Sequence, residues 1–153
     1  MSTQSTDFYF EDFQVGQQME SPARTVTETD LVQFAALSGD YNAIHTDAEF
    51  AKGTPFGERI VHGLLGLWIA SVRGVRAGFV ESSVIAFTGL TWKFKKPVLI
   101  GDTIRVRAKV AKTRSLGSTG GGMVVFAVQV LNQRDERVQQ GEWTMLFKGR
   151  AGE

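Results

Sequence analysis

Residues 60 to 72 read IVHGLLGLWIASV, and the apolar character of this stretch continues to about residue 79. Large apolar residues recur along it every three or four positions, as on one face of a helix, at Ile60, Leu64, Leu67, Trp68 and Val72. We therefore predict one long helix over residues 60–79. His62, Arg73 and Arg76 interrupt the run, which makes a buried helix a better interpretation than a membrane span.

This predicted helix carries four glycines, at positions 63, 66, 74 and 78. A glycine inside a helix costs roughly 1 kcal/mol relative to alanine. Four of them in one helix indicate that a sheet packs closely around it, because a missing side chain allows two backbones to approach each other.

Beyond residue 82 the pattern changes from helical spacing to alternation. Residues 102–110 read DTIRVRAKV, in which apolar and charged residues alternate as in a strand with one buried face. Comparable strands are predicted at 83–96, 123–131 and 138–148, and the glycine-rich segment 117–122 is a flexible hairpin connection. One long helix followed by four long strands predicts an α+β fold, with an antiparallel sheet wrapped around one central helix. Such a sheet leaves one edge and one apolar face unpaired, so we expect a homodimer with the sheets joined edge to edge.

Two shorter helices are predicted before the long one. Thr27, with an acidic residue three positions later, forms a capping-box pattern for a helix over residues 28–38. Gly39 suits the left-handed position that ends this helix. One or two further helical turns are expected over residues 46–52, with Thr46 as N-cap.

Between these helices, residues 38–47 read SGDYNAIHTD and contain the candidate chemistry. Asp40 and His45 form a plausible proton-transfer pair, because a carboxyl group is ionised and an imidazole partly protonated near neutral pH. An isolated pair with this spacing is usually a turn-capping carboxylate and a surface histidine. The context favours chemistry, since Gly63 at the start of the long helix would offer its backbone N–H to a developing negative charge.

The pattern Asp40-x-Asn42-x-x-His45, followed by a Val-His-Gly helix start, resembles the hydratase-2 motif of MaoC-like (R)-specific enoyl-CoA hydratases. The resemblance covers roughly residues 10–149. It implies a hotdog fold and a hydro-lyase that converts trans-2-enoyl-CoA to (R)-3-hydroxyacyl-CoA, or the reverse dehydration. One departure is Ala43, where the family usually has proline.

The resemblance also implies a role for each site residue. Asp40 and His45 would hold a water molecule and exchange protons with it, while the Gly63 N–H would hold the thioester oxygen as enolate charge develops. Asn42 is expected to orient the loop, and His62 chiefly to hold the loop together through its ring nitrogens. No cofactor is expected, because coenzyme A enters as part of the substrate.

Further residues are candidates for lining the substrate site, together with Asn42 and His62. A serine in the position of Ser71 lines the site in this family, although a small residue packed against a sheet explains it equally well. Phe56, Trp68 and Phe87 are candidates for an acyl pocket, although aromatic residues at such spacing are more often core.

Composition limits the remaining function classes. A chain of 153 residues predicts a single domain at 10–149, between a flexible leader (1–9) and a short tail (150–153). The net charge of +1 without a basic block does not suggest nucleic acid, and no membrane partner is expected. The absence of cysteine excludes thiolate catalysis and fits a cytoplasmic protein. No metal site is expected, because the two histidines lack a close ligand spacing in the sequence.

Two other functions remain open from the sequence. A hotdog thioesterase would use a carboxylate to direct water at the thioester carbonyl. A non-catalytic subunit would only bind acyl thioesters, and Ala43 in place of proline keeps that alternative open. The dimer is also compatible with a larger dimer of dimers.

Overall fold

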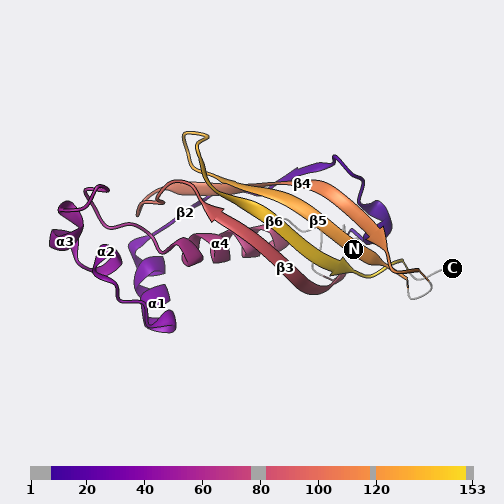
Figure 1. Ribbon diagram of the computed structural model, residues 1–153, viewed down its shortest axis with the longest axis horizontal. Coiled ribbons are helices and arrows are strands. Elements are labelled where there is room, and N and C mark those ends of the chain that lie inside the picture. Colours follow the sequence, from indigo (N-terminus) through magenta and orange to yellow (C-terminus); the bar gives the residue numbers. More distant parts are fainter. Residues whose placement is uncertain (1–7, 77–81, 118–119, 151–153) are drawn as a thin grey trace, which may run out of the picture.

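The computed structural model describes residues 8–76, 82–117 and 120–150, and Figure 1 shows a long curved sheet with one helix, α4, along it. The sheet has six strands and is antiparallel throughout. Its order is β1-β4-β5-β6-β3, and β2 pairs with the N-terminal end of β4. The strands are β1 (Gln18–Glu20), β2 (Arg24–Thr25), β3 (Val84–Phe94), β4 (Thr103–Ser115), β5 (Gly122–Leu131) and β6 (Arg137–Phe147). The predicted α+β architecture is therefore confirmed.

The core lies between α4 (Gly63–Arg76) and the inner face of the sheet. Leu65 and Ile69 of the helix are buried in it, and Ile104, Val106 and Val110 are the buried positions of β4. The alternation in β4 matches the predicted strand, because every second residue of a strand faces the same side.

The long helix begins three residues later than predicted. Residues 60–62 are extended instead of helical: Ile60 forms a bridge with Leu99, and the Val61 N–H donates to the Val98 carbonyl at 2.8 Å. The apolar spacing of Ile60 arises from its pairing with another extended segment and not from a helical turn. The predicted helix residues 77–79, with Gly78, lie outside the described residues.

The close packing inferred from the glycines is found at the start of α4. A methyl group at Gly63 would lie 2.8 Å from the Phe94 ring, and one at Gly66 would collide with the side-chain amide of Gln139. The helix backbone therefore rests directly on β3 and β6 at these two positions.

The helix α1 (Glu28–Ser38) matches its prediction. The Thr27 hydroxyl accepts from the Asp30 N–H, the Asp30 carboxylate accepts from the Thr27 N–H at 2.8 Å, and Gly39 ends the helix with φ 75°. Burial raises the pKa of Asp30, but hydrogen bonds from Thr27 and Arg24 outweigh it, and the net effect lowers this pKa.

The prediction for residues 46–52 was wrong in its cap. Two short helices occur, α2 (Ala43–Thr46) and α3 (Ala48–Lys52), capped by Asn42 and Asp47. Thr46 is the last residue of α2, and its hydroxyl donates to the Tyr41 and Asn42 carbonyls behind it. Carboxylate and amide side chains are at least as good N-caps as threonine, so these two neighbours take the cap positions.

Residues 1–7 and 151–153 of the expected leader and tail lie outside the described residues. The leader residue Tyr9 precedes a 3-10 turn, η1 (Phe10–Asp12), and its N–H donates to the Asp12 carboxylate at 2.9 Å. Arg150 pairs with the same carboxylate at 2.7 Å, so the two ends of the described chain meet. Within the described ranges, no helix is both long and apolar enough to cross a bilayer.

Candidate functional site

The loop after α1 is shaped by its own polar side chains. The Asp40 N–H donates to the Ser38 hydroxyl, and the Asp40 carboxylate accepts from the Asn42 N–H at 3.2 Å. Asn42 in turn caps α2 by accepting from the Ile44 N–H at 3.2 Å. Asn42 therefore lies where it orients the loop, and the Asp40 side chain remains half exposed (50%).

His45 has one ring nitrogen fixed and one free. Its Nδ1 lies 2.7 Å from the Ile60 carbonyl oxygen, which only accepts, so Nδ1 carries the hydrogen. In the neutral ring Nε2 is then an unprotonated acceptor. It faces the Asp40 carboxylate at 4.0 Å, in a side chain that is only 12% exposed.

His62 is buried directly behind this pair. It is 2% exposed, its ring stacks on that of His45 with centroids 3.9 Å apart, and Phe34 lies 5.0 Å away. Its Nε2–H donates to the backbone carbonyl of Asp40 at 2.9 Å. His62 thus connects the start of α4 to the loop that carries Asp40 and His45, and it does not reach the large pocket described below.

Asp40, His45 and His62 offer possible metal-ligand atoms within 4.8 Å of one another. The sequence-based reason for expecting no metal was therefore wrong, because folding stacks two histidines that are far apart in the chain. The hydrogen bonds argue against a ligand set, since the His62 nitrogen nearest the carboxylate already donates to a carbonyl. An N–H group cannot coordinate a metal, whereas the arrangement suits proton transfer.

Gly63 follows His62 and is the first residue of α4. Its N–H belongs to the first turn, where backbone donors have no acceptor within the helix and the helix dipole is positive. Its carbonyl accepts a hydrogen bond from the Gln139 side chain at 3.1 Å. This puts a free donor next to the stacked histidines.

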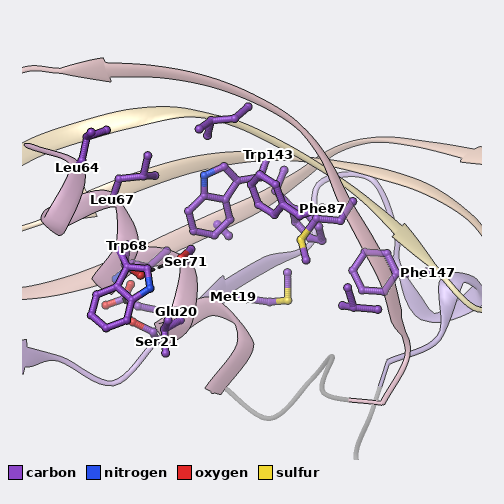
Figure 2. A pocket seen from close by; sticks show the side chains of 17 residues that line it. Met19, Glu20, Ser21, Leu64, Leu67, Trp68, Ser71, Phe87, Trp143 and Phe147 are labelled. Carbon is purple, nitrogen blue, oxygen red and sulfur yellow. Dashed lines mark hydrogen bonds between the residues drawn. The ribbon is translucent and has the colours of Figure 1, made fainter. Parts of the chain in front are cut away.

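A chamber of about 590 Å³ lies between α4 and the sheet (Figure 2). Leu64, which follows Gly63, lines it, so the chamber adjoins the start of α4. Of the predicted substrate residues, Trp68, Ser71 and Phe87 line it, whereas Phe56 lies exposed between α3 and α4 and does not. The other walls are almost entirely apolar and come from β1, β3, β4, β5 and β6: Met19, Val84, Leu90, Val106, Ala108, Phe126, Trp143, Met145 and Phe147.

Three polar side chains in the chamber wall already have partners, whereas the buried indole N–H of Trp143, which also lines the chamber, has none among the described residues. The Ser71 hydroxyl donates to the Trp68 carbonyl at 2.8 Å, and the Ser21 hydroxyl donates to the Pro22 carbonyl. Hydrogen bonds from Arg105 and Arg107 lower the pKa of Glu20 and keep it charged. None of these three side chains is free to bind a polar acyl group. Sequence reasoning missed most of this wall, because strand residues from five elements form it.

Ala43 occupies the first position of α2, where proline is favoured. Asn42 has ψ 135°, which is the conformation that a following proline requires. We expect Ala43→Pro to raise the free energy of unfolding by about 0.4–1 kcal/mol by restricting the unfolded chain. Urea titration would measure this change in the free energy of unfolding. Ile44→Pro is the contrasting variant, because it removes the N–H that Asn42 caps; equal stability of the two variants would contradict this placement.

Comparison with known proteins finds relatives that are named as MaoC proteins, dehydratases or hydratases. A MaoC-like domain model matches residues 12–131. The 3-hydroxybutyryl-CoA dehydratase of Methylorubrum extorquens is 41% identical over 106 residues, which are 68% of this chain and 64% of that protein. The (R)-specific enoyl-CoA hydratase of Rhodospirillum rubrum is 39% identical over 103 residues, which are 67% of this chain and 69% of that protein. Protein MaoC of Klebsiella aerogenes is 45% identical over 65% of this chain, but the match spans only 29% of that protein.

Solved structures agree with the architecture. The R-hydratase PhaJ1 of Pseudomonas aeruginosa superposes with a TM-score of 0.79 at 31% identity, covering 94% of this chain and 88% of that one. A protein from Archaeoglobus described as a monoamine oxidase regulatory protein gives 0.86 at 40% identity, with coverages of 95% and 97%. A double-hotdog protein of Mycobacterium tuberculosis gives 0.82 at 18% identity, covering 97% of this chain and 46% of that one, which supports the fold alone. The chain therefore belongs to the MaoC-like dehydratase family and has a hotdog fold.

Proposed function

We propose that this protein is a hydro-lyase that interconverts trans-2-enoyl-CoA and (R)-3-hydroxyacyl-CoA. The observation that carries the proposal is the free Nε2 of His45, which faces the Asp40 carboxylate at 4.0 Å beside the first turn of α4. That separation is too long for a direct hydrogen bond and leaves space for a shared water molecule. Relatives named as a dehydratase and as an (R)-specific hydratase support the same reaction class.

The residues divide the hydration reaction between them. His45 Nε2 takes a proton from the shared water as its oxygen bonds to the β-carbon of the enoyl group. The electron pair of the double bond moves towards the thioester carbonyl, and the Gly63 N–H stabilises the resulting enolate oxygen. Asp40 and His45 then return a proton to the α-carbon, so H and OH add across the double bond. Dehydration follows the same steps in reverse.

The chamber beside Leu64 supplies a place for the acyl group. Its walls are apolar, Ser71 and Glu20 are already bonded, and no cationic side chain in the described part of the protein lines it, which favours a hydrocarbon chain over one with a second carboxylate. Coenzyme A would remain outside, attached through the thioester at the start of α4.

Purified protein incubated with enoyl-CoA esters of increasing chain length tests the function. We expect loss of the conjugated enoyl-thioester absorbance and an (R)-3-hydroxyacyl product on chiral analysis. Release of free CoA thiol without hydration would instead identify a thioesterase. Stabilisation by CoA esters without any turnover would identify a binding subunit, and either result would contradict the proposal.

The role of Ser71 is tested by its size and not by its hydroxyl. The Ser71 hydroxyl bonds to a carbonyl of its own helix and not to the substrate. Ser71→Ala should therefore keep kcat/KM within about twofold for every substrate. Ser71→Leu should narrow the chamber and lower kcat/KM by about tenfold for long acyl chains, in line with the roughly 1–3 kcal/mol that one methylene is worth in an apolar substrate pocket. A large loss in Ser71→Ala would instead assign the hydroxyl to the reaction.

We also infer a homodimer joined at the edge strand β3. The strand carries Ile85, an apolar side chain that is 55% exposed and does not line the acyl chamber. Unpaired strand edges with apolar side chains favour pairing with another chain, and a lysine there opposes it. Sedimentation should give a dimer for the wild type and for Val15→Lys, which changes an exposed apolar residue outside β3, but a monomer for Ile85→Lys. A monomeric wild type would contradict the inference.

A further inference from the structure

We propose that Gln139, near the start of β6, is a positioning residue that fixes the start of α4 so that the Gly63 N–H is aimed at the reacting thioester. The proposal rests on the proposed hydratase function. Gln139 is only 2% exposed and does not line the acyl chamber, so it acts on the substrate only through the helix.

Both ends of this buried amide are hydrogen-bonded. The Trp92 indole N–H donates to its Oε1 at 3.1 Å, and its Nε2–H donates to the Gly63 carbonyl at 3.1 Å. The indole is only a donor and the carbonyl only an acceptor, so the amide has a single possible orientation. A buried amide in an apolar core is unfavourable unless its hydrogen bonds are made, so this connection is held firmly in place.

The contacts around Gln139 show why the helix start cannot move freely. Phe94 is the cross-strand neighbour of Gln139, and its ring covers the Cα of Gly63. One turn later, a methyl group at Gly66 would lie 3.2 Å from the side-chain Cδ of Gln139 and collide with its nitrogen. Two glycines of α4 thus rest on one cross-strand pair of the sheet.

This anchoring bears on the chemistry because an oxyanion donor works only when it is aligned beforehand. A donor must lie about 2.7–3.1 Å from the position that the enolate oxygen reaches in the transition state. The first turn of α4 is held at its carbonyl by Gln139 and at the preceding residue by the bond from His62 to Asp40. Removal of the Gln139 donor frees the Gly63–Leu64 peptide, and with it the adjoining His62–Gly63 peptide, which carries the Gly63 N–H. The loss of alignment costs transition-state stabilisation, while the strand walls of the acyl chamber stay in place.

The expected signature is a split between kcat and KM. Gln139→Met has a similar length and no donor, and it should lower kcat for enoyl-CoA hydration about tenfold while KM stays within about twofold. Gln140→Met is the matched control, because the neighbouring side chain points to the other face of the sheet, and its kcat should equal that of the wild type.

Gln139→Glu supplies a second readout. A protonated carboxylic acid can accept from Trp92 and donate to the Gly63 carbonyl, whereas a carboxylate cannot donate, and burial favours the protonated form. The kcat of this variant relative to the wild type should therefore rise from mildly alkaline to mildly acidic pH. A residue that only fills space would give a flat ratio.

The possible outcomes separate this inference from the proposed function. An active wild type with Gln139→Met equal to it in kcat, or with a flat ratio for Gln139→Glu, would overturn the role of Gln139 alone. If Gln139→Met does not fold, the pH ratio of Gln139→Glu decides. A wild type that hydrates no enoyl-CoA would overturn both proposals together.

Discussion

Asp40→Asn is expected to lower kcat for enoyl-CoA hydration by about 10²–10⁴-fold, the range typical for loss of a positioned acid or base. The side-chain oxygen introduced at position 40 can still accept a hydrogen bond from the Asn42 N–H. The backbone carbonyl of residue 40, to which His62 donates, is unchanged. The loop should therefore keep its shape while the carboxylate next to the shared water is lost. Thermal unfolding would verify that the fold is intact.

His45→Gln should produce a loss of similar size, because glutamine can donate to the Ile60 carbonyl but offers no imidazole base. The double variant should be scarcely worse than either single one, since residues that act as a unit are strongly non-additive. Asp47→Asn is the matched control: asparagine caps α3 as well as aspartate does, and activity should be unchanged. Full activity in Asp40→Asn or His45→Gln would remove this pair from the mechanism.

The largest expected effect on stability is that of Gly141→Ala. A methyl group at Gly141 would collide with the Thr91 carbonyl oxygen and lie 2.6 Å from a ring carbon of Trp92. Gly141 pairs with Trp92 across β6 and β3, so the two strands would have to separate. We expect about 3 kcal/mol of destabilisation, at the upper end for overpacking. In a domain of this size that corresponds to a Tm about 6–12 °C lower, measurable by calorimetry.

Gly53→Ala is the control for this prediction. Gly53 has φ −80°, and a methyl group there would lie 3.4 Å from the Phe50 carbonyl oxygen, which is close to ordinary contact. The substitution should change the free energy of unfolding by less than about 1 kcal/mol. If both variants unfold at the wild-type temperature, the close approach of β3 and β6 is not as the structure has it.

Periodicity in the sequence predicted the helices and strands in which apolar residues recur on one face. The alternation of Ile104 and Val106 with charged neighbours identified β4, and Thr27 with Gly39 bounded α1 closely. The start of α4 was misplaced because an apolar residue in a paired extended segment, such as Ile60, fits a helical pattern equally well. The residue types around Ile60 could not distinguish a helical turn from an extended segment.

The site was predictable to the extent that it is local in sequence. Asp40, Asn42 and His45 lie within six residues, and their motif identified them. The stacking of His62 on His45 depends on how the chain returns to the loop, which no local pattern encodes. Gln139 gave no signal at all, because a glutamine in a strand usually faces solvent, and only its tertiary partners explain its burial.

Asp40 contributes to the molecule twice, through its backbone and through its side chain. The backbone carbonyl anchors His62, whereas the carboxylate faces His45. A mutation at this codon can therefore remove the proposed reaction and leave the apolar chamber intact. In gene duplicates, descent from a catalyst to a non-catalytic binding protein would need very few steps, whereas loss of His62 would also remove the hydrogen bond that joins the start of α4 to the loop.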